Sequence, residues 1–134
     1  MLFLALAAMV GADTVASAHP VWRCRNQIEV WCTADGCAAT KSDEFTPMDI
    51  TADPNGGLSI CAYSGCWESQ VKAKRRRGRA LWAADDARFS TNPGGERSQA
   101  TLLVFEKDGV GFVRIGALAT PLLCSHEPAP AGSP

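Results

Sequence analysis

The sequence predicts an all-β domain, built as a small antiparallel barrel or a two-layer sandwich of about seven to nine short strands and stapled by disulfides. Three observations lead to this fold class. Short runs rich in Val, Ile, Leu, Phe and Trp alternate with turn sequences such as DPNGG and KDGV. No segment keeps an i, i+3, i+4 apolar pattern over three turns, so no helix is expected. The chain also carries six cysteines, an even number.

The N-terminus indicates export. MLFLALAAMVGADTVASA has an apolar run from Leu2 to Val10 and ends in an A-x-A cleavage motif, as a secretory signal peptide does. A membrane span needs about 20 apolar residues, and Gly11 and Asp13 interrupt that length. We therefore expect a signal peptide at 1–18, one disulfide-linked β-domain at 19–125 and a disordered tail, HEPAPAGSP, at 126–134. The expected location is the periplasm or the exterior, with no transmembrane span in the mature chain.

The net charge of the mature chain does not indicate a particular class of binding partner. All 13 Lys and Arg residues lie beyond residue 18, and removing Asp13 leaves 13 of the 14 acidic residues, so the net charge is near zero. A neutral chain gives no general reason to expect nucleic-acid or membrane binding.

The expected strands follow one another with short connections. Alternation in IEVWC at 28–32 predicts the first, PMDIT at 47–51 runs into the turn DPNGG, and LSICA at 58–62 leaves that turn. GCWESQVKA alternates next, and ALWAA at 80–84 and ARFS at 87–90 precede the loop TNPGGE. The last element is a hairpin over 100–118, in which Asp108-Gly109 turns two apolar runs.

The cysteines are expected to form disulfides, because export delivers them to an oxidising compartment. WCTADGCA and ICAYSGCW each place four residues between two cysteines, with Gly36 or Gly65 last in the loop. Glycine adopts the positive φ that such a hairpin loop needs, and cross-strand neighbours lie within disulfide range. Six thiols allow fifteen pairings, and this local geometry favours one of them. The expected pairs are Cys32–Cys37, Cys61–Cys66 and, with the two that remain, Cys24–Cys124.

A four-thiolate zinc site, built from the two C-x4-C units, is the alternative use of these cysteines. Zinc requires thiolates, and its cysteine pairs most often come as C-x2-C to C-x4-C. An oxidising compartment favours the disulfides over this site.

Period-two alternation assigns faces to two of the bridges. Ile28, Val30 and Cys32 share a face, so the first bridge is expected toward the core. The leucine and isoleucine of LSICA face opposite to Cys61, so the second bridge is expected on the outer face, with Trp67 pointing inward.

The run KAKRRRGRA at 72–80 holds six basic residues in eight positions. One interpretation is a polyanion site for nucleic acid, acidic polysaccharide or lipid head groups, built on Lys74, Arg75, Arg76 and Arg77. The other is a solvated hairpin tip with Gly78 in the turn, which the lack of interleaved aromatic residues favours.

Residue types typical of catalysis are scarce, so no catalytic residue and no cofactor is expected. The chain has no G-x-S-x-G and no H-E-x-x-H, and the adjacent Asp85 and Asp86 would point to opposite faces of a strand. One metal hypothesis is a copper brace made by the α-amino group and imidazole of His19, if cleavage exposes it, together with His126. Frayed termini are the alternative for both histidines.

A resemblance covers most of the mature chain. WRCRNQIEVWC, FTPMDI, LSICAYSGCWES and GALATPLLC resemble elements of a group of short, uncharacterised exported bacterial proteins with W-x-C and C-x-Y-S-G-C-W motifs. This resemblance implies export and cystine content and no activity. The plan is also similar in outline to periplasmic lysozyme inhibitors of the eight-stranded barrel type. Their inhibitory loop is missing, because Ser64-Gly65 runs directly into Cys66-Trp67, so no functional residue carries over.

These observations favour an exported, non-catalytic binding or envelope-interaction module whose partner is an envelope protein or a polyanion. Tyr63 and Ser64 stand at the tip of the second cysteine loop and are the expected binding residues there. The alternative is a small metal or ligand carrier, or an enzyme with an unfamiliar centre. Ligand carriage would be indicated by a barrel pocket lined by Trp31, Trp67, Trp82 and Phe112, although such tryptophans more often form a core.

Overall fold

The fold comes from a computed structural model that describes residues 19–40, 43–90 and 94–127. These ranges form eleven strands and no helix. The expected signal peptide at 1–18, and the expected tail beyond residue 127, lie outside the described residues. The strands are β1 (Val21–Arg25), β2 (Glu29–Thr33), β3 (Gly36–Thr40), β4 (Asp49–Ala52), β5 (Leu58–Ala62), β6 (Gly65–Ser69), β7 (Lys74–Arg76), β8 (Arg79–Phe89), β9 (Arg97–Phe105), β10 (Val110–Ile115) and β11 (Leu118–Glu127).

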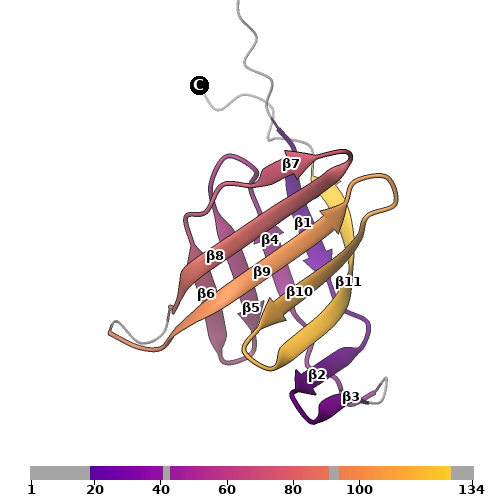
Figure 1. Cartoon of the computed structure of the whole chain (residues 1–134), viewed down its shortest axis with the longest axis vertical. Coiled ribbons are helices and arrows are strands. Elements are labelled where there is room, and N and C mark those ends of the chain that lie inside the picture. Colours follow the sequence, from indigo (N-terminus) through magenta and orange to yellow (C-terminus); the bar gives the residue numbers. More distant parts are fainter. Residues whose placement is uncertain (1–18, 41–42, 91–93, 128–134) are drawn as a thin grey trace, which may run out of the picture.

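Eight of the strands close into an antiparallel barrel (Figure 1). The order around it is β1-β4-β5-β6-β8-β9-β10-β11, and β11 pairs back onto β1. Two attachments lie off this ring: the β2–β3 hairpin continues the ladder along β11, and β7 pairs with β8. Of the two architectures left open by the sequence, the barrel is therefore the right one.

The interior is filled by alternate residues of every barrel strand. Trp82 is fully buried, and its indole Nε1–H donates to the carbonyl oxygen of Asp53 at 3.0 Å. The other inward positions of β8 are alanines, and on β9 Leu102 lies directly opposite Trp82. The core consists of Trp22, Cys24, Met48, Ile50, Ala52, Leu58, Ile60, Ala80, Trp82, Ala84, Ala87, Ala100, Leu102, Val104, Val113, Ile115, Leu118 and Leu122.

β8 is one long strand, whereas the sequence predicts two. The ladder with β9 shifts register between Ala84 and Ala87, both of which are buried. A bulge of this kind leaves the intervening residues off the alternation. Asp85 and Asp86 are therefore both exposed, and the prediction that they face opposite sides is wrong.

Three disulfides join the cysteines that the sequence pairs: Cys24–Cys124, Cys32–Cys37 and Cys61–Cys66. Each bridge connects residues directly opposite each other on neighbouring antiparallel strands, with Cα atoms about 4 Å apart. These are the pairs that exchange no backbone hydrogen bonds and so lie closest. Their amide N–H groups point away from the bridge: Cys32 N to Ala117 O at 2.7 Å, Cys124 N to Gly109 O at 2.7 Å and Cys66 N to Ser90 Oγ at 3.2 Å.

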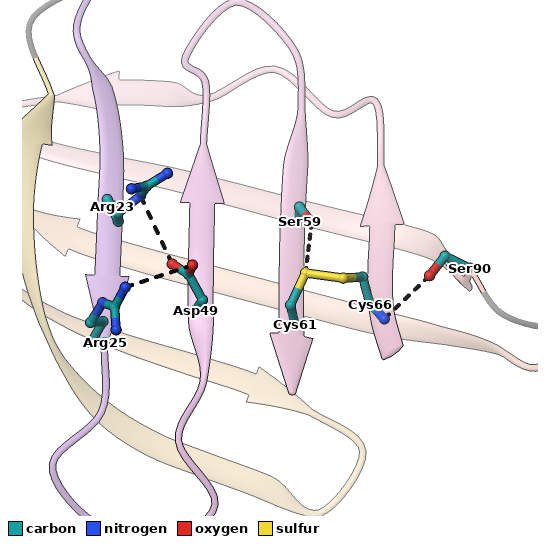
Figure 2. The surroundings of a disulfide bond; sticks show 7 residues. All are labelled: Arg23, Arg25, Asp49, Ser59, Cys61, Cys66 and Ser90. Carbon is teal, nitrogen blue, oxygen red and sulfur yellow. Dashed lines mark hydrogen bonds and ion pairs between the residues drawn. A yellow bond between two sulfur atoms is a disulfide. The ribbon is translucent and has the colours of Figure 1, made fainter. Parts of the chain in front are cut away.

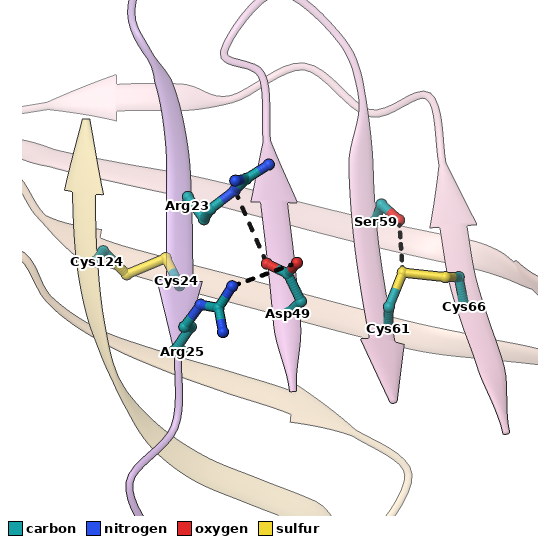
Figure 3. Close-up of polar contacts among 8 residues, drawn as sticks. All are labelled: Arg23, Cys24, Arg25, Asp49, Ser59, Cys61, Cys66 and Cys124. Atoms are coloured by element: carbon teal, nitrogen blue, oxygen red, sulfur yellow. Dashed lines mark hydrogen bonds and ion pairs between the residues drawn. A yellow bond between two sulfur atoms is a disulfide. The ribbon is translucent and has the colours of Figure 1, made fainter. Parts of the chain in front are cut away.

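The three bridges have different surroundings. Cys24–Cys124 ties β1 to β11, the seam where the barrel closes, and Cys24 is fully buried (Figure 3). Cys61–Cys66 lies on the opposite face of β5 from the buried Ile60, as predicted. The prediction for Cys32–Cys37 is wrong, because the β2–β3 hairpin extends beyond the barrel and Ile28 is exposed. Ile28 precedes β2; within the strand Val30 and Cys32 share a face, but the opposite face carries the buried residue, Glu29.

The end of the β-domain also differs from the prediction. β11 continues to Glu127, two residues past the expected boundary at 125. His126 pairs with Trp22 of β1 in the ladder, and their rings are 3.5 Å apart between centroids.

Candidate functional site

Large apolar side chains are exposed in two separate places on the described surface. Trp31 and Tyr63 lie at one end of the barrel, and Ile28, Phe112 and Leu123 lie on its outer wall. Isolated exposed apolar residues need no explanation, but clustered ones mark binding surfaces. The end of the barrel also has a cavity, so we consider it first as a candidate site.

This end, which we call the mouth, is a cavity of about 260 Å³ between the β2 strand and the β5–β6 hairpin. Aromatic rings and aliphatic side chains dominate its walls, with a few polar groups between them. A shallower depression continues from it past Ile115 and Ala117, and Trp31 and Trp67 border both hollows. The lining of the mouth includes Glu29, Trp31, Thr46, Met48, Ile60, Ser64, Trp67, Phe89 and Leu118.

A buried carboxylate holds the Trp31 indole in place. Trp31 is 46% exposed, yet its Nε1–H donates to Glu29 Oε1 at 2.5 Å. The other oxygen, Glu29 Oε2, accepts the backbone N–H of Thr46 at 3.1 Å. Glu29 itself is only 8% exposed, and both carboxylate oxygens have a donor, as a buried charge requires. The indole is thus presented to solvent in one orientation.

Asn26 fixes the segment that carries Thr46. Its Nδ2 donates to the carbonyl oxygens of Ile28 and Thr46 at 3.1 and 2.9 Å, and its Oδ1 accepts the Met48 N–H at 2.8 Å. Within the described ranges, three polar residues are buried, and Asn26 and Glu29 are two of them. Sequence reasoning missed both, because a lone Asn or Glu near a strand end carries no pattern that distinguishes burial from exposure.

The opposite wall is built by the β5–β6 hairpin and the end of β8. Trp67 is half-buried and packs against Phe89 with 5.1 Å between ring centroids. Ser90 binds the hairpin next to its turn, since its Oγ accepts the Cys66 N–H, and Ser59 Oγ lies 3.3 Å from Cys61 Sγ (Figure 2). The disulfide and these contacts make this wall rigid.

The two expected binding residues of this hairpin occupy its turn. Tyr63 is 84% exposed, and Ser64 borders the mouth. Gly65 has φ +142°, the positive value that the loop was expected to need. The turn therefore presents an aromatic ring and a hydroxyl group at the same end of the barrel as the Trp31 indole.

Only two of the four aromatic residues proposed for a barrel pocket border the mouth. Trp31 and Trp67 line it. Trp82 is buried in the core, and Phe112 points outward from β10 at 48% exposure. The barrel interior is therefore packed at Trp82, and the mouth lies at the end of the barrel.

The basic run forms a hairpin tip, with Arg77 and Gly78 in a turn at φ +50° and +72°. Arg75 Nε donates to Glu106 Oε1 at 2.8 Å, and this hydrogen bond raises the pKa of Arg75 above its usual value. Arg75 Nη1 also donates to His19 Nδ1 at 3.0 Å. Lys74 and Arg76 are exposed, and neither has an ion-pair or hydrogen-bond partner within the described ranges.

The metal hypotheses meet different geometry. Cys32, Cys37, Cys61 and Cys66 are bonded to each other, so no thiolates remain for zinc. His19 contacts Arg75, whereas the His126 ring lies on Trp22. Among the residues described, no group of three or more His, Cys, Asp or Glu side chains could hold a metal ion.

Comparison with known proteins adds no assignment: no family model matches the chain, and no curated protein or solved structure matches it either. Over the part of the chain that the structure describes, no helix is both long and apolar enough to cross a membrane.

Proposed function

We propose that this protein is an exported binding module that recognises a partner protein through the mouth. The observation that carries the proposal is the Trp31 indole, which is exposed and yet fixed by the buried Glu29. An exposed aromatic ring is normally free to turn, and fixing it in advance lowers the entropy lost on binding. Tryptophan and tyrosine are also the residues that most often dominate binding energy at interfaces.

The size of the mouth favours an inserted side chain over a whole small molecule. Pockets for drug-sized ligands span about 300 to 1,000 Å³ and enclose most of the ligand. The mouth holds about 260 Å³ and opens to solvent beside Tyr63. That volume suits one apolar or aromatic side chain of a partner, with Tyr63 and Ser64 contacting the surrounding surface.

The chemistry of Glu29 supports binding and not acid–base catalysis. A catalytic carboxylate must reach the proton that it transfers. Both oxygens of Glu29 are occupied, one by Trp31 and one by Thr46. The residue therefore positions the indole.

Export supports the choice of an envelope protein as the partner. The N-terminal pattern of a signal peptide and three disulfides are typical of proteins from an oxidising compartment, the periplasm or the exterior. The resemblance to short exported bacterial proteins agrees with this location.

Site-specific photo-cross-linking tests the proposal. A photoreactive p-benzoylphenylalanine at position 63 should form a discrete adduct with an envelope extract of the source organism. The adduct should be lost when Trp31→Ala is added. The matched control carries the same group at Asn55, which is exposed in the β4–β5 turn at the other end of the barrel. Equal adducts from both positions, or an adduct indifferent to Trp31→Ala, would contradict recognition through the mouth.

A further inference from the structure

The outer wall of the barrel carries a second exposed apolar surface. Strands β8, β9 and β10 form the near wall in Figure 1, with β11 beside them. Their register places Leu81 opposite Leu103, Leu103 opposite Phe112, and Phe112 opposite Pro121. A second row contains Phe105, then Val110 opposite Leu123. We call these two rows the outer band; its members are Leu81, Leu103, Phe105, Val110, Phe112, Pro121 and Leu123.

All of these side chains point away from the core, because their chain neighbours on β8, β9 and β10 are buried. Phe112 is 48% exposed and Leu123 is 51% exposed. Ile28 extends the band, since it borders a shallow hollow together with Val110, Pro121 and Leu123. Antiparallel sheets with one solvated face normally alternate apolar and polar residues, and apolar residues on both faces are typical of strands covered on both sides. The outer band therefore has the composition of a sheet face that is covered by a binding partner.

Basic residues border the outer band: they lie at both ends of the second row and at one end of the first. Lys74 lies opposite Leu81, and Arg79 lies opposite Phe105. Arg25 lies opposite Leu123 at the other end, and Arg114 follows Phe112 on the same face of β10. Lys74, Arg79 and Arg114 have no ionic partner among the residues that the structure describes.

The acidic groups near the band are already engaged. Asp49 lies 3.8 Å from Arg25, and Glu106 lies 2.8 Å from Arg75. Asp108 Oδ1 accepts the N–H of Val110 in the turn. Each of these two ion pairs is neutral, and the three cations without an ionic partner within the described ranges, Lys74, Arg79 and Arg114, outnumber Asp108, so the charge around the apolar surface is net positive.

We propose that the outer band docks on an anionic lipid surface, with its apolar side chains at the acyl boundary and its basic rim among the head groups. Peripheral membrane binding combines these two features, buried apolar area and attraction to anionic lipid. A second copy of this chain fits less well, because two identical bands would bring their unpaired cations together. The proposal concerns a surface separate from the mouth.

Vesicle flotation with the oxidised protein tests this docking. We expect binding to vesicles of 70% phosphatidylcholine and 30% phosphatidylglycerol at 0.1 M salt, and weak or no binding to phosphatidylcholine alone. A Lys or Arg near such a surface changes partitioning about fivefold, so Lys74→Ala with Arg79→Ala should weaken binding about 25-fold. Phe112→Ser with Leu123→Ser should weaken binding by a similar factor. Each of these side chains is about half exposed, and docking buries that exposed half.

Arg88→Ala is the matched control, because Arg88 is exposed on β8 beyond the bulge and outside the band. It should bind as the unchanged protein does, and circular dichroism should show all variants folded. The charge variant alters only exposed side chains and keeps the test valid if the apolar variant unfolds.

Three results would overturn the proposal. The first is no binding to phosphatidylglycerol vesicles. The second is binding that Lys74→Ala with Arg79→Ala removes but folded Phe112→Ser with Leu123→Ser leaves intact, which would indicate a polyanion site without apolar contact. The third is a dimer in sedimentation that depends on Phe112 and Leu123, which would indicate that a second copy of the chain covers the band.

Discussion

Removing the Cys24–Cys124 disulfide should destabilise the protein far more than removing either hairpin disulfide. The bridge closes a loop with a sequence separation of 100, whereas Cys61–Cys66 has a separation of 5. Loop-closure entropy assigns about 4.7 kcal/mol to a loop of 100 residues and about 2 kcal/mol to one of six. Cys24 is also fully buried, so Cys24→Ala with Cys124→Ala adds a cavity to the entropic loss.

Urea unfolding followed by circular dichroism measures this difference. With an m-value of about 1.5 kcal/mol/M, a gap of about 2.7 kcal/mol separates the two midpoints by about 1.8 M. Cys32→Ala with Cys37→Ala is the control, because its loop is as short as the Cys61–Cys66 loop and it should fall beside that variant. If all three double variants lost equal stability, closure of the barrel seam would not depend on the long bridge, and the reasoning would be refuted.

Three further changes have expected outcomes in thermal or urea unfolding. Gly109→Ala should cost about 2 kcal/mol more than Gly78→Ala in free energy of unfolding. Both glycines have φ +72°, but a Cβ added at Gly109 would collide with the carbonyl oxygen of Cys124, whereas a Cβ added at Gly78 would have no heavy atom within 4 Å. Equal costs would show that the contact with β11 relaxes freely. Trp82→Phe should cost about 2 kcal/mol or more, because it leaves a void and deprives Asp53 O of its donor, and a neutral effect would contradict the packed interior. Arg75→Ala should cost less than about 1 kcal/mol, since its pair with Glu106 lies at the surface and is partly exposed; a larger loss would mean that the hairpin tip stabilises the barrel.

The sequence predicts the all-β fold and the disulfides well, because both depend on local spacing. The C-x4-C units place each cysteine pair across a short hairpin, and Gly36 and Gly65 take the positive φ that closes it. With four cysteines used locally, the remaining two meet where the first and last barrel strands pair.

Face assignments fail where the alternation does not say which side is covered. In β2 the burial falls on Glu29, because a carboxylate with two donors can be buried while Ile28 faces outward. In β8 the register shifts at Asp85 and Asp86, so both reach solvent. The strand β11 has no clear signal, because Pro121 lacks the N–H that a central strand normally donates.

The two surfaces differ in how visible they are in sequence. Residue type alone singles out the mouth residues Trp31, Trp67, Tyr63 and Ser64. The hydrogen bond from Trp31 to Glu29 is a side-chain contact that residue type does not predict. The outer band has a sequence signal in LLVF at 102–105, where apolar residues occupy both faces of one strand.

Nitrogen relaxation of the indole Nε1–H groups tests whether Trp31 is fixed in advance of binding. The exposed Trp31 should have an order parameter close to that of buried Trp82, about 0.85, and Glu29→Gln should lower the Trp31 value below about 0.6 while Trp82 stays unchanged. Glutamine can keep only one of the two acceptors that Trp31 and Thr46 use. A Trp31 order parameter that is already low in the unchanged protein, or that is indifferent to Glu29→Gln, would contradict a binding mouth built on a fixed indole.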